Sequence, residues 1–99
     1  MPRFSVYINP EGVGYLLDVQ ANLLSHLNTR MVVPLLPKAA APKPAQTLNP
    51  TFDIEGATCV MVTQFMAAVP QTMLQTRVLS VEHRAHEVVS ALDCLFQGV

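Results

Sequence analysis

The chain has 99 residues, enough for one domain with one hydrophobic core. Hydrophobic residues make up 51% and charged residues 13%, about half of the roughly 25% usual for soluble domains. With a net charge of −1 and six Lys and Arg residues, tight direct binding of nucleic acid is not expected, because such binding relies on many cations that contact phosphates. So little charge predicts a substantial apolar patch, buried in a dimer or against a partner.

The composition also bears on localisation and on the cysteines. The first residues lack the apolar run of a signal peptide, and no stretch reaches the roughly 18 apolar residues of a membrane span. We therefore expect a cytoplasmic protein that does not bind a membrane. Cys59 and Cys94 have no metal spacing around them, and in a reducing compartment they are expected to be free thiols used in packing.

Two strands open the chain and are expected to pair as a hairpin. Residues 3–9 alternate apolar and polar side chains, which is typical of a strand, and residues 15–20 form a second apolar run. The turn chemistry of Asn-Pro-Glu-Gly at 9–12 lies between them. Asp18 interrupts the second run, and a structural role, in water or capping a backbone group, is favoured over catalysis.

The middle of the chain alternates between loop and strand signals. Residues 21–28 place leucines among polar residues and predict a turn or a short loop. Residues 30–36 are the most β-prone run and predict a central strand up to Pro34, where it bends or meets an edge because proline cannot donate to a ladder. The Pro/Ala-rich segment 38–50 predicts an extended, polyproline-like loop, either mobile or a docking surface for a partner.

The following segment carries the last strand signals. Residues 51–54 and 58–63 predict two strands around a turn at 55–57. Residues 64–70 are expected to be a short apolar connector, and residues 73–79 the last strand. Because the connections are local, antiparallel pairing is favoured. We therefore expect a mainly β protein, with a small, strongly bent antiparallel sheet or partly open barrel and one C-terminal helix across it.

Residues 80–99 predict that amphipathic helix. Ser80 suits the N-cap and Gly98 the C-terminal stop. The apolar side spans roughly 160°, more than a helix needs to cover one sheet. It consists of Val81, Ala85, Val88, Val89, Ala91, Leu92, Leu95 and Phe96, and it also contains the charged Arg84. Packing on the chain's own sheet is favoured, and a subunit or target interface is the alternative.

Catalytic and metal-binding patterns are weak. His83, His86 and Glu87 share the polar face of the helix, but zinc needs further ligands that no spacing supplies, so a solvated face is favoured. A nucleophile elbow of the G-x-S-x-G type is absent from the sequence. A ribonuclease could use an arginine to steady phosphate, but each candidate also suits a strand end or a salt bridge. We expect an interaction protein without catalytic residues, metal or cofactor.

Short motifs along nearly the whole chain point to one family. They are FSVY at 4–7, DVQ at 18–20, RMVVPL at 30–35, MVT at 61–63, M-A-x-V-P at 66–70, H-R at 83–84 and the closing F-x-G-V at 96–99. In these motifs the sequence resembles the CcdB toxins of CcdA/CcdB toxin–antitoxin pairs, which poison bacterial DNA gyrase. The segment 38–50 does not share the resemblance.

The resemblance implies an SH3-like barrel with a C-terminal helix, a single toxin domain over 1–99, and no catalysis. It implies a homodimer with the two helices near the dyad, and an interface that includes Leu92, Leu95 and Phe96. The dimer would enter the A subunit of gyrase on cleaved DNA and block resealing. A CcdA-like antitoxin would strip it off, and would make the DNA contacts when the pair represses its own operon.

The gyrase-contacting positions of the family correspond to Leu23, Leu24, Asp93, Gln97, Gly98 and Val99. The largest departure is Gln97, which replaces a tryptophan that stacks on a gyrase arginine, a loss of about 0.5–2 kcal/mol. Asp93 replaces an asparagine and adds a charge that could favour an arginine. Two alternatives stay open, an endoribonuclease toxin of the MazF or Kid type on the same fold and a toxin homologue that has lost activity.

Overall fold

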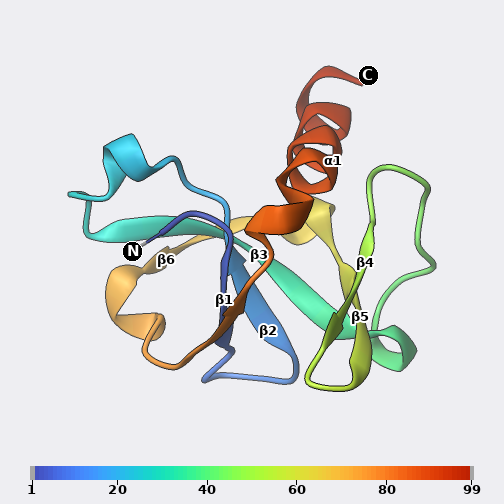
Figure 1. Cartoon of the computed structure of the whole chain (residues 1–99), viewed down its shortest axis with the longest axis horizontal. Coiled ribbons are helices and arrows are strands. Elements are labelled where there is room, and N and C mark those ends of the chain that lie inside the picture. Colours follow the sequence, from blue (N-terminus) through green and yellow to red (C-terminus); the bar gives the residue numbers. More distant parts are fainter. Residues whose placement is uncertain (1, 99) are drawn as a thin grey trace.

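The computed structural model describes residues 2–98 as one curled antiparallel sheet followed by an α-helix (Figure 1). The elements are β1 (Ser5–Ile8), β2 (Tyr15–Asp18), β3 (Thr29–Pro37), β4 (Thr51–Ile54), β5 (Ala57–Met61), β6 (Ala67–Pro70), β7 (Arg77–Ser80) and α1 (Ala85–Gln97). The strand order is β4-β5-β3-β2-β1-β7, with β6 paired to β3. The open half-barrel with a C-terminal helix confirms the expected SH3-like fold.

The first hairpin forms as predicted, and β3 lies at the centre of the sheet. Along β1 and β2, Val6 faces Leu17 and Ile8 faces Tyr15. β2 pairs with one edge of β3, and β6 and β5 share the other. β3 is therefore the strand on which the other segments are assembled.

β3 does not stop at Pro34, and that expectation was wrong. The strand runs on to Pro37, but its partner on one edge changes from β6 to β5 around Pro34. The Pro34 carbonyl accepts a hydrogen bond of 3.0 Å from the Val62 N–H. Since the N and C=O of one strand residue point to the same side, the missing donor faces the junction between β6 and β5 and interrupts no ladder.

Other details differ from the sequence prediction, and the strands expected at 3–9, 15–20 and 58–63 are observed at 5–8, 15–18 and 57–61. The connector expected at 64–70 ends in a strand, because residues 67–70 pair with the first half of β3. The last strand begins at Arg77 rather than at 73, since Gln71–Met73 forms a 3₁₀ turn. The loop 38–50 begins with a 3₁₀ turn at Lys38–Ala40 and has no further helix or strand.

Alternate residues of the central strands enter two hydrophobic clusters on opposite faces of the sheet. The main core includes Val6, Leu17, Val33, Leu35, Ile54 and Met61, together with Val88 and Ala91 of α1. The smaller cluster is built from Tyr7, Leu16, Val32 and Leu74. β1 to β3 therefore bury side chains on both faces of the sheet where the loop after β2 leaves it.

The helix packs on the sheet as far as Leu92 and not at its end. Val88 and Ala91 are fully buried, whereas Phe96 is 70% exposed. The second half of α1 stands away from the sheet (Figure 1). The prediction that the helix packs on its own sheet is thus confirmed for its beginning and wrong for its end, because the curled sheet offers no surface that far out.

The two ends of the helix differ in how well they match the predicted caps. Gly98 adopts φ +70° and donates its N–H to the Cys94 carbonyl at 3.1 Å, which confirms the stop. Ser80 is not the N-cap of α1: its Oγ accepts from the Glu82 N–H, ahead of a 3₁₀ turn, and α1 begins at Ala85.

Arg84 is accommodated in the apolar arc because its guanidinium stacks over an aromatic ring. Its guanidinium is 4.1 Å from the centroid of the Phe52 ring, and it donates to both carboxylate oxygens of Glu87 at 2.8 and 2.6 Å. The ion pair raises the pKa of Arg84 and lowers that of Glu87. Both carboxylate oxygens of Glu87 are therefore bonded to Arg84. Within residues 2–98, no group of three or more His, Cys, Asp or Glu residues could hold a metal ion.

Both cysteines are free thiols, as expected. Cys59 is buried in the main core and Cys94 is half-buried on α1. Burial raises the pKa of the Cys59 thiol. In the described part of the chain, no helix is long and apolar enough to cross a membrane.

Candidate partner-binding site

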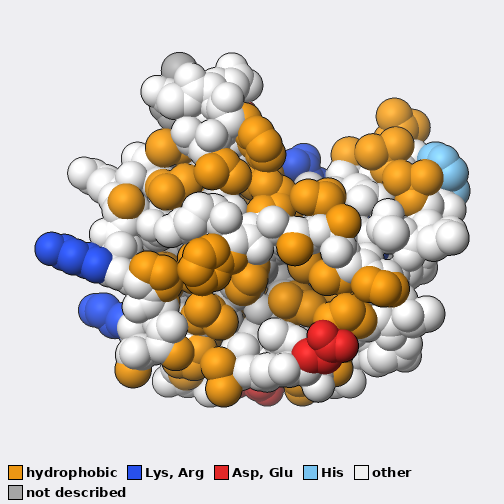
Figure 2. All heavy atoms as spheres, turned by 180° about the vertical axis from the view of Figure 1, so that it is seen from behind, with side chains coloured by type: hydrophobic (Ala, Val, Ile, Leu, Met, Phe, Trp, Pro, Cys, Tyr) orange, Lys and Arg blue, Asp and Glu red, His pale blue; other side chains and the backbone are white. Residues whose placement is uncertain are grey.

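Exposed apolar side chains are plentiful, as the low charge predicted. Hydrophobic side chains cover much of the face in Figure 2, and charged side chains are sparse there. Among residues 2–98, Leu23 is the most exposed large hydrophobic residue, with 86% of its surface open, and Leu24 and Leu27 are exposed beside it. Phe65, Val89 and Phe96, in and near the helix, are also exposed large hydrophobic residues. Such side chains lower solubility when left uncovered, which makes this surface the candidate for binding a partner.

Leu23 and Leu24 lie in a 3₁₀ turn, η1 (Asn22–Leu24), in the loop between β2 and β3. The Leu24 N–H donates to the Ala21 carbonyl at 3.0 Å, and the Ser25 N–H donates to the Asn22 carbonyl at 3.0 Å. The Leu27 N–H then donates to the Leu24 carbonyl at 3.1 Å. The backbone thus forms successive tight turns whose side chains point outward.

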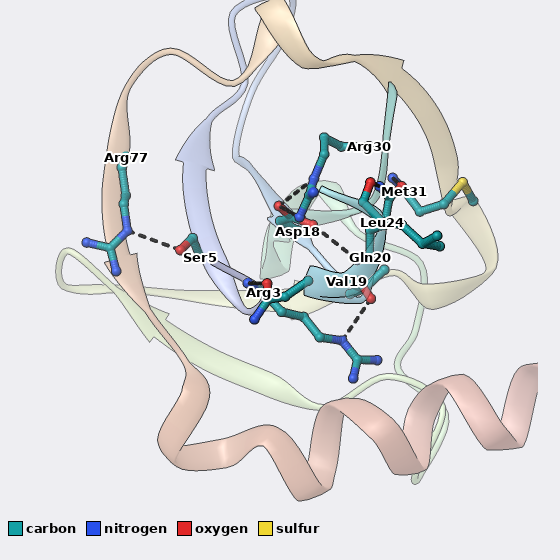
Figure 3. A network of polar contacts seen from close by, with 10 residues as sticks. Arg3, Ser5, Asp18, Val19, Gln20, Leu24, Arg30, Met31 and Arg77 are labelled. Atoms are coloured by element: carbon teal, nitrogen blue, oxygen red, sulfur yellow. Dashed lines mark hydrogen bonds and ion pairs between the residues drawn. The ribbon is translucent and has the colours of Figure 1, made fainter. Parts of the chain in front are cut away.

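A buried ion pair lies beneath this loop (Figure 3). Asp18 and Arg30 have no exposed side-chain surface, and Arg30 donates from Nε and Nη2 to Asp18 Oδ2 at 3.0 and 2.6 Å. The other carboxylate oxygen accepts from the Gln20 N–H at 3.1 Å. The expected structural role of Asp18 is confirmed through this backbone cap, although the side chain does not face water.

The electrostatics of this pair are those of a desolvated site. The pKa of Asp18 is raised because burial disfavours the carboxylate, while the hydrogen bond from Arg30 acts in the opposite direction. Loss of hydration offsets much of the attraction between two such charges. The main effect of the pair is therefore to fix the position of the chain on either side of the loop.

Side chains also fasten the loop at both ends of η1. The Arg3 N–H donates to Asn22 Oδ1 at 2.7 Å, and Arg3 Nε donates to the Val19 carbonyl at 2.9 Å. Gln20 Nε2 donates to the Leu24 carbonyl at 3.0 Å, and Gln20 Oε1 accepts from the Met31 N–H at 3.1 Å. These bonds bracket the exposed side chain of Leu23.

The second group of predicted contact residues lies at the end of α1. Asp93 is half-buried, and Gln97 and Gly98 are exposed. Val99 lies outside the described residues. In Figure 1 the end of α1 and the loop that carries η1 project toward the same end of the molecule, at separate positions. The structure thus brings the two groups to one side of the sheet without placing them in contact.

The loop 38–50 is anchored where it rejoins the sheet. The Asn49 side chain is 6% exposed, donates to the Met61 carbonyl at 3.0 Å and to Gln64 Oε1 at 2.9 Å, and accepts from the Ala45 N–H at 3.0 Å. Between this loop and α1 runs a groove of about 450 Å³, whose walls include Thr47, Asn49, His86 and Ser90. The loop therefore ends in a defined position beside the helix.

The network under η1 was not predicted from the sequence. Its members lie in the motifs DVQ and RMV, which carried the family resemblance. The motifs indicated the family but not the contacts between these side chains. The available signal was charge: an aspartate and an arginine stand in two neighbouring, otherwise apolar strand runs. Such charges enter a core only when they are paired.

A curled SH3-like sheet, one C-terminal helix, and exposed apolar residues on a fastened loop and a projecting helix define a small binding module. The family model described as CcdB protein matches residues 3–98, nearly the entire chain. The chain therefore belongs to the CcdB family, which are toxins of toxin–antitoxin pairs. The resemblance found in the short motifs is confirmed. The assignments of individual contact residues stay predictions.

Proposed function

We propose that the protein poisons DNA gyrase by binding rather than by catalysis. A homodimer would bind the A subunit while the enzyme holds cleaved DNA, and would prevent resealing until a CcdA-like antitoxin removes it. The observation that carries the proposal is the family match over residues 3–98, combined with the solvent-exposed leucines of η1. Residues 1–99 would act as a single toxin domain.

The proposed contact consists of Leu23, Leu24, Asp93, Gln97, Gly98 and Val99. Leu23 and Leu24 have apolar surface that the chain itself leaves uncovered. Burying a leucine in a target pocket contributes about 1.5–3 kcal/mol. The two leucines would supply apolar affinity, and the helix end would supply the polar contacts.

Asp93 and Gln97 suit an arginine of the target without aromatic stacking. Asp93 lies near the C-terminal end of α1, where the helix dipole is negative, and no basic residue stands in the last turn. The negative potential there attracts a cation, and Gln97 adds a hydrogen-bonding amide. A charge-assisted contact would thus replace the ring that the family pattern places at position 97.

The proposed dimer interface lies on the outer half of α1. Phe96 is exposed and Leu95 is half-buried near the end of the helix, while Leu92 is half-buried at the edge of the main core. A second copy of the chain would cover these residues at a two-fold axis. Sedimentation at micromolar concentration should then give twice the 10.8 kDa chain mass.

The test of the proposal is a cleavage assay with purified gyrase, supercoiled plasmid and ATP. Cleaved plasmid should accumulate after denaturation of the enzyme, and in proportion to added toxin. If no cleaved plasmid accumulates, gyrase poisoning is ruled out. A parallel incubation with RNA serves as the control, since cleavage there would favour a ribonuclease of the same fold.

A further inference from the structure

Leu23 stands out because its side chain is almost fully exposed while its backbone is tightly held. An exposed leucine on a free loop would lose its freedom on binding, at about 1–2 kcal/mol for each backbone residue that becomes ordered. Here the turn is formed before any partner arrives. The residues that hold it therefore influence affinity without touching the partner.

The Leu24 carbonyl is the point at which the loop is held. It accepts from the Leu27 N–H within the loop at 3.1 Å and from Gln20 Nε2 below it at 3.0 Å. Gln20 is 7% exposed, and its Oε1 is bound to the Met31 N–H on β3. One amide thus connects the loop to the central strand.

Gln20 is itself held by the buried ion pair. Its backbone N–H donates to Asp18 Oδ1, and Asp18 is bound to Arg30 through Oδ2. The line of contacts therefore runs from the ion pair through Gln20 to the carbonyl of Leu24. The bonds at Asp18 are buried and the two bonds of the Gln20 side chain are partly buried, so water competes less for them than for bonds at the open surface.

We propose that Gln20 is a positioning residue for the contact loop, which holds η1 in the shape that presents Leu23 and Leu24 to the target. The proposal rests on the proposed function for the identity of the target. It assigns no contact with gyrase to Gln20 itself. Its role is exerted through the carbonyl of Leu24.

Asn49 provides a matched control for Gln20. Both are buried side-chain amides that join a loop to the sheet, and Asn49 anchors the loop 38–50 rather than η1. Gln20→Ala and Asn49→Ala should lower the melting temperature by similar amounts. If Gln20→Ala does not fold, Gln20→Met is used, because it fills the same volume without a donor or acceptor.

Two measurements separate positioning from stability. In the gyrase cleavage assay, Gln20→Ala should require about tenfold more protein for half-maximal trapping, and Asn49→Ala less than about threefold more. In hydrogen exchange of the protein alone, the amides of residues 24–27 should exchange faster in Gln20→Ala and remain unchanged in Asn49→Ala. Equal loss of trapping in both variants, or unchanged exchange in the loop, would overturn the proposal.

The failure of the proposed function gives a different result. If the parent protein never traps cleaved DNA, gyrase poisoning is excluded and the exchange experiment alone decides the role of Gln20. Faster exchange confined to the loop would then support its positioning role toward another target. Exchange that is unchanged, or that rises throughout the chain, would refute it.

Discussion

Asp18 and Arg30 form an ion pair of 2.6 Å in which neither side chain has solvent-exposed surface. They lie on adjacent strands, β2 and β3, and flank the loop that carries η1. Asp18→Ala should cost about 3–5 kcal/mol, because it leaves the buried Arg30 without its balancing carboxylate. Urea denaturation measures the loss.

The double variant Asp18→Leu/Arg30→Met is the control, since it removes both charges and keeps apolar volume. It should be at least about 2 kcal/mol more stable than Asp18→Ala. If the two variants were equally unstable, packing volume rather than charge balance would explain the loss.

Gly14 and Gly56 both adopt positive φ, at +82° and +84°, but their surroundings differ. A Cβ on Gly14 would lie 2.3 Å from the Leu35 carbonyl oxygen on β3, whereas a Cβ on Gly56 would meet nothing within 4 Å. Gly56→Ala should therefore lower the free energy of unfolding only by the cost of a left-handed backbone conformation, about 1–2 kcal/mol. Gly14→Ala should cost at least about 1 kcal/mol more, because the clash is with backbone. Equal melting temperatures would contradict the close approach at Gly14.

Val88 and Phe96 test how much of α1 belongs to the core. Val88→Ala should lower the free energy of unfolding by about 1.5–3 kcal/mol, because Val88 is fully buried. Phe96→Ala should change it by less than about 0.5 kcal/mol when measured at protein concentrations at which the chain is monomeric. At higher concentrations Phe96→Ala should weaken the proposed dimer, which light scattering would detect. Strong destabilisation of the monomer by Phe96→Ala would place the helix end in the core instead.

The C-terminal tail separates folding from target binding. A chain that ends at Phe96 loses Gln97, Gly98 and Val99 and, within the structure, the hydrogen bond from Gly98 to Cys94. We expect the free energy of unfolding to fall by about 0.5–1.5 kcal/mol. The shortened protein should stay folded but no longer trap cleaved DNA. Gln97→Trp should instead strengthen trapping, by about 0.5–2 kcal/mol, through stacking on a target arginine. Undiminished trapping by the shortened chain would show that the tail is not the contact.

The two free thiols should differ in reactivity. Cys59 is buried and its pKa is raised by desolvation, so at pH 8 it holds less thiolate than an exposed cysteine. Cys94 is partly exposed on α1. In the folded protein, a thiol reagent should therefore modify Cys94 first and Cys59 only at the rate of unfolding. Mass spectrometry of digested samples identifies the modified residue, and initial modification of Cys59 would contradict the burial.

Several features were predictable from short stretches because their causes are local. The alternation in residues 5–8 and the turn at 9–12 predict the first hairpin, and the glycine at 98 predicts the end of the helix. The turn Glu55-Gly56 is another, since both residues have positive φ and connect two strands directly. The family was also readable from short motifs, since these preserve residue identity and spacing.

Other features depended on partners that are distant in the chain. Residues 67–70 form a strand because β3 offers a free edge, although alanines have little preference for strands. The apolar pattern of the helix continues to Phe96, but the curled sheet ends before it. The pattern alone therefore could not distinguish residues of the core from residues of an interface.

By itself, the sequence determined the mainly β class, the C-terminal helix and the family of this protein. Only the tertiary structure decided that Asp18, Gln20 and Arg30 form one network that reaches the carbonyl of Leu24. The physical reason is that a motif records which residues are present, whereas a hydrogen bond depends on distance and direction between atoms. Those are settled only when β2 and β3 pair and exclude water from the groups between them.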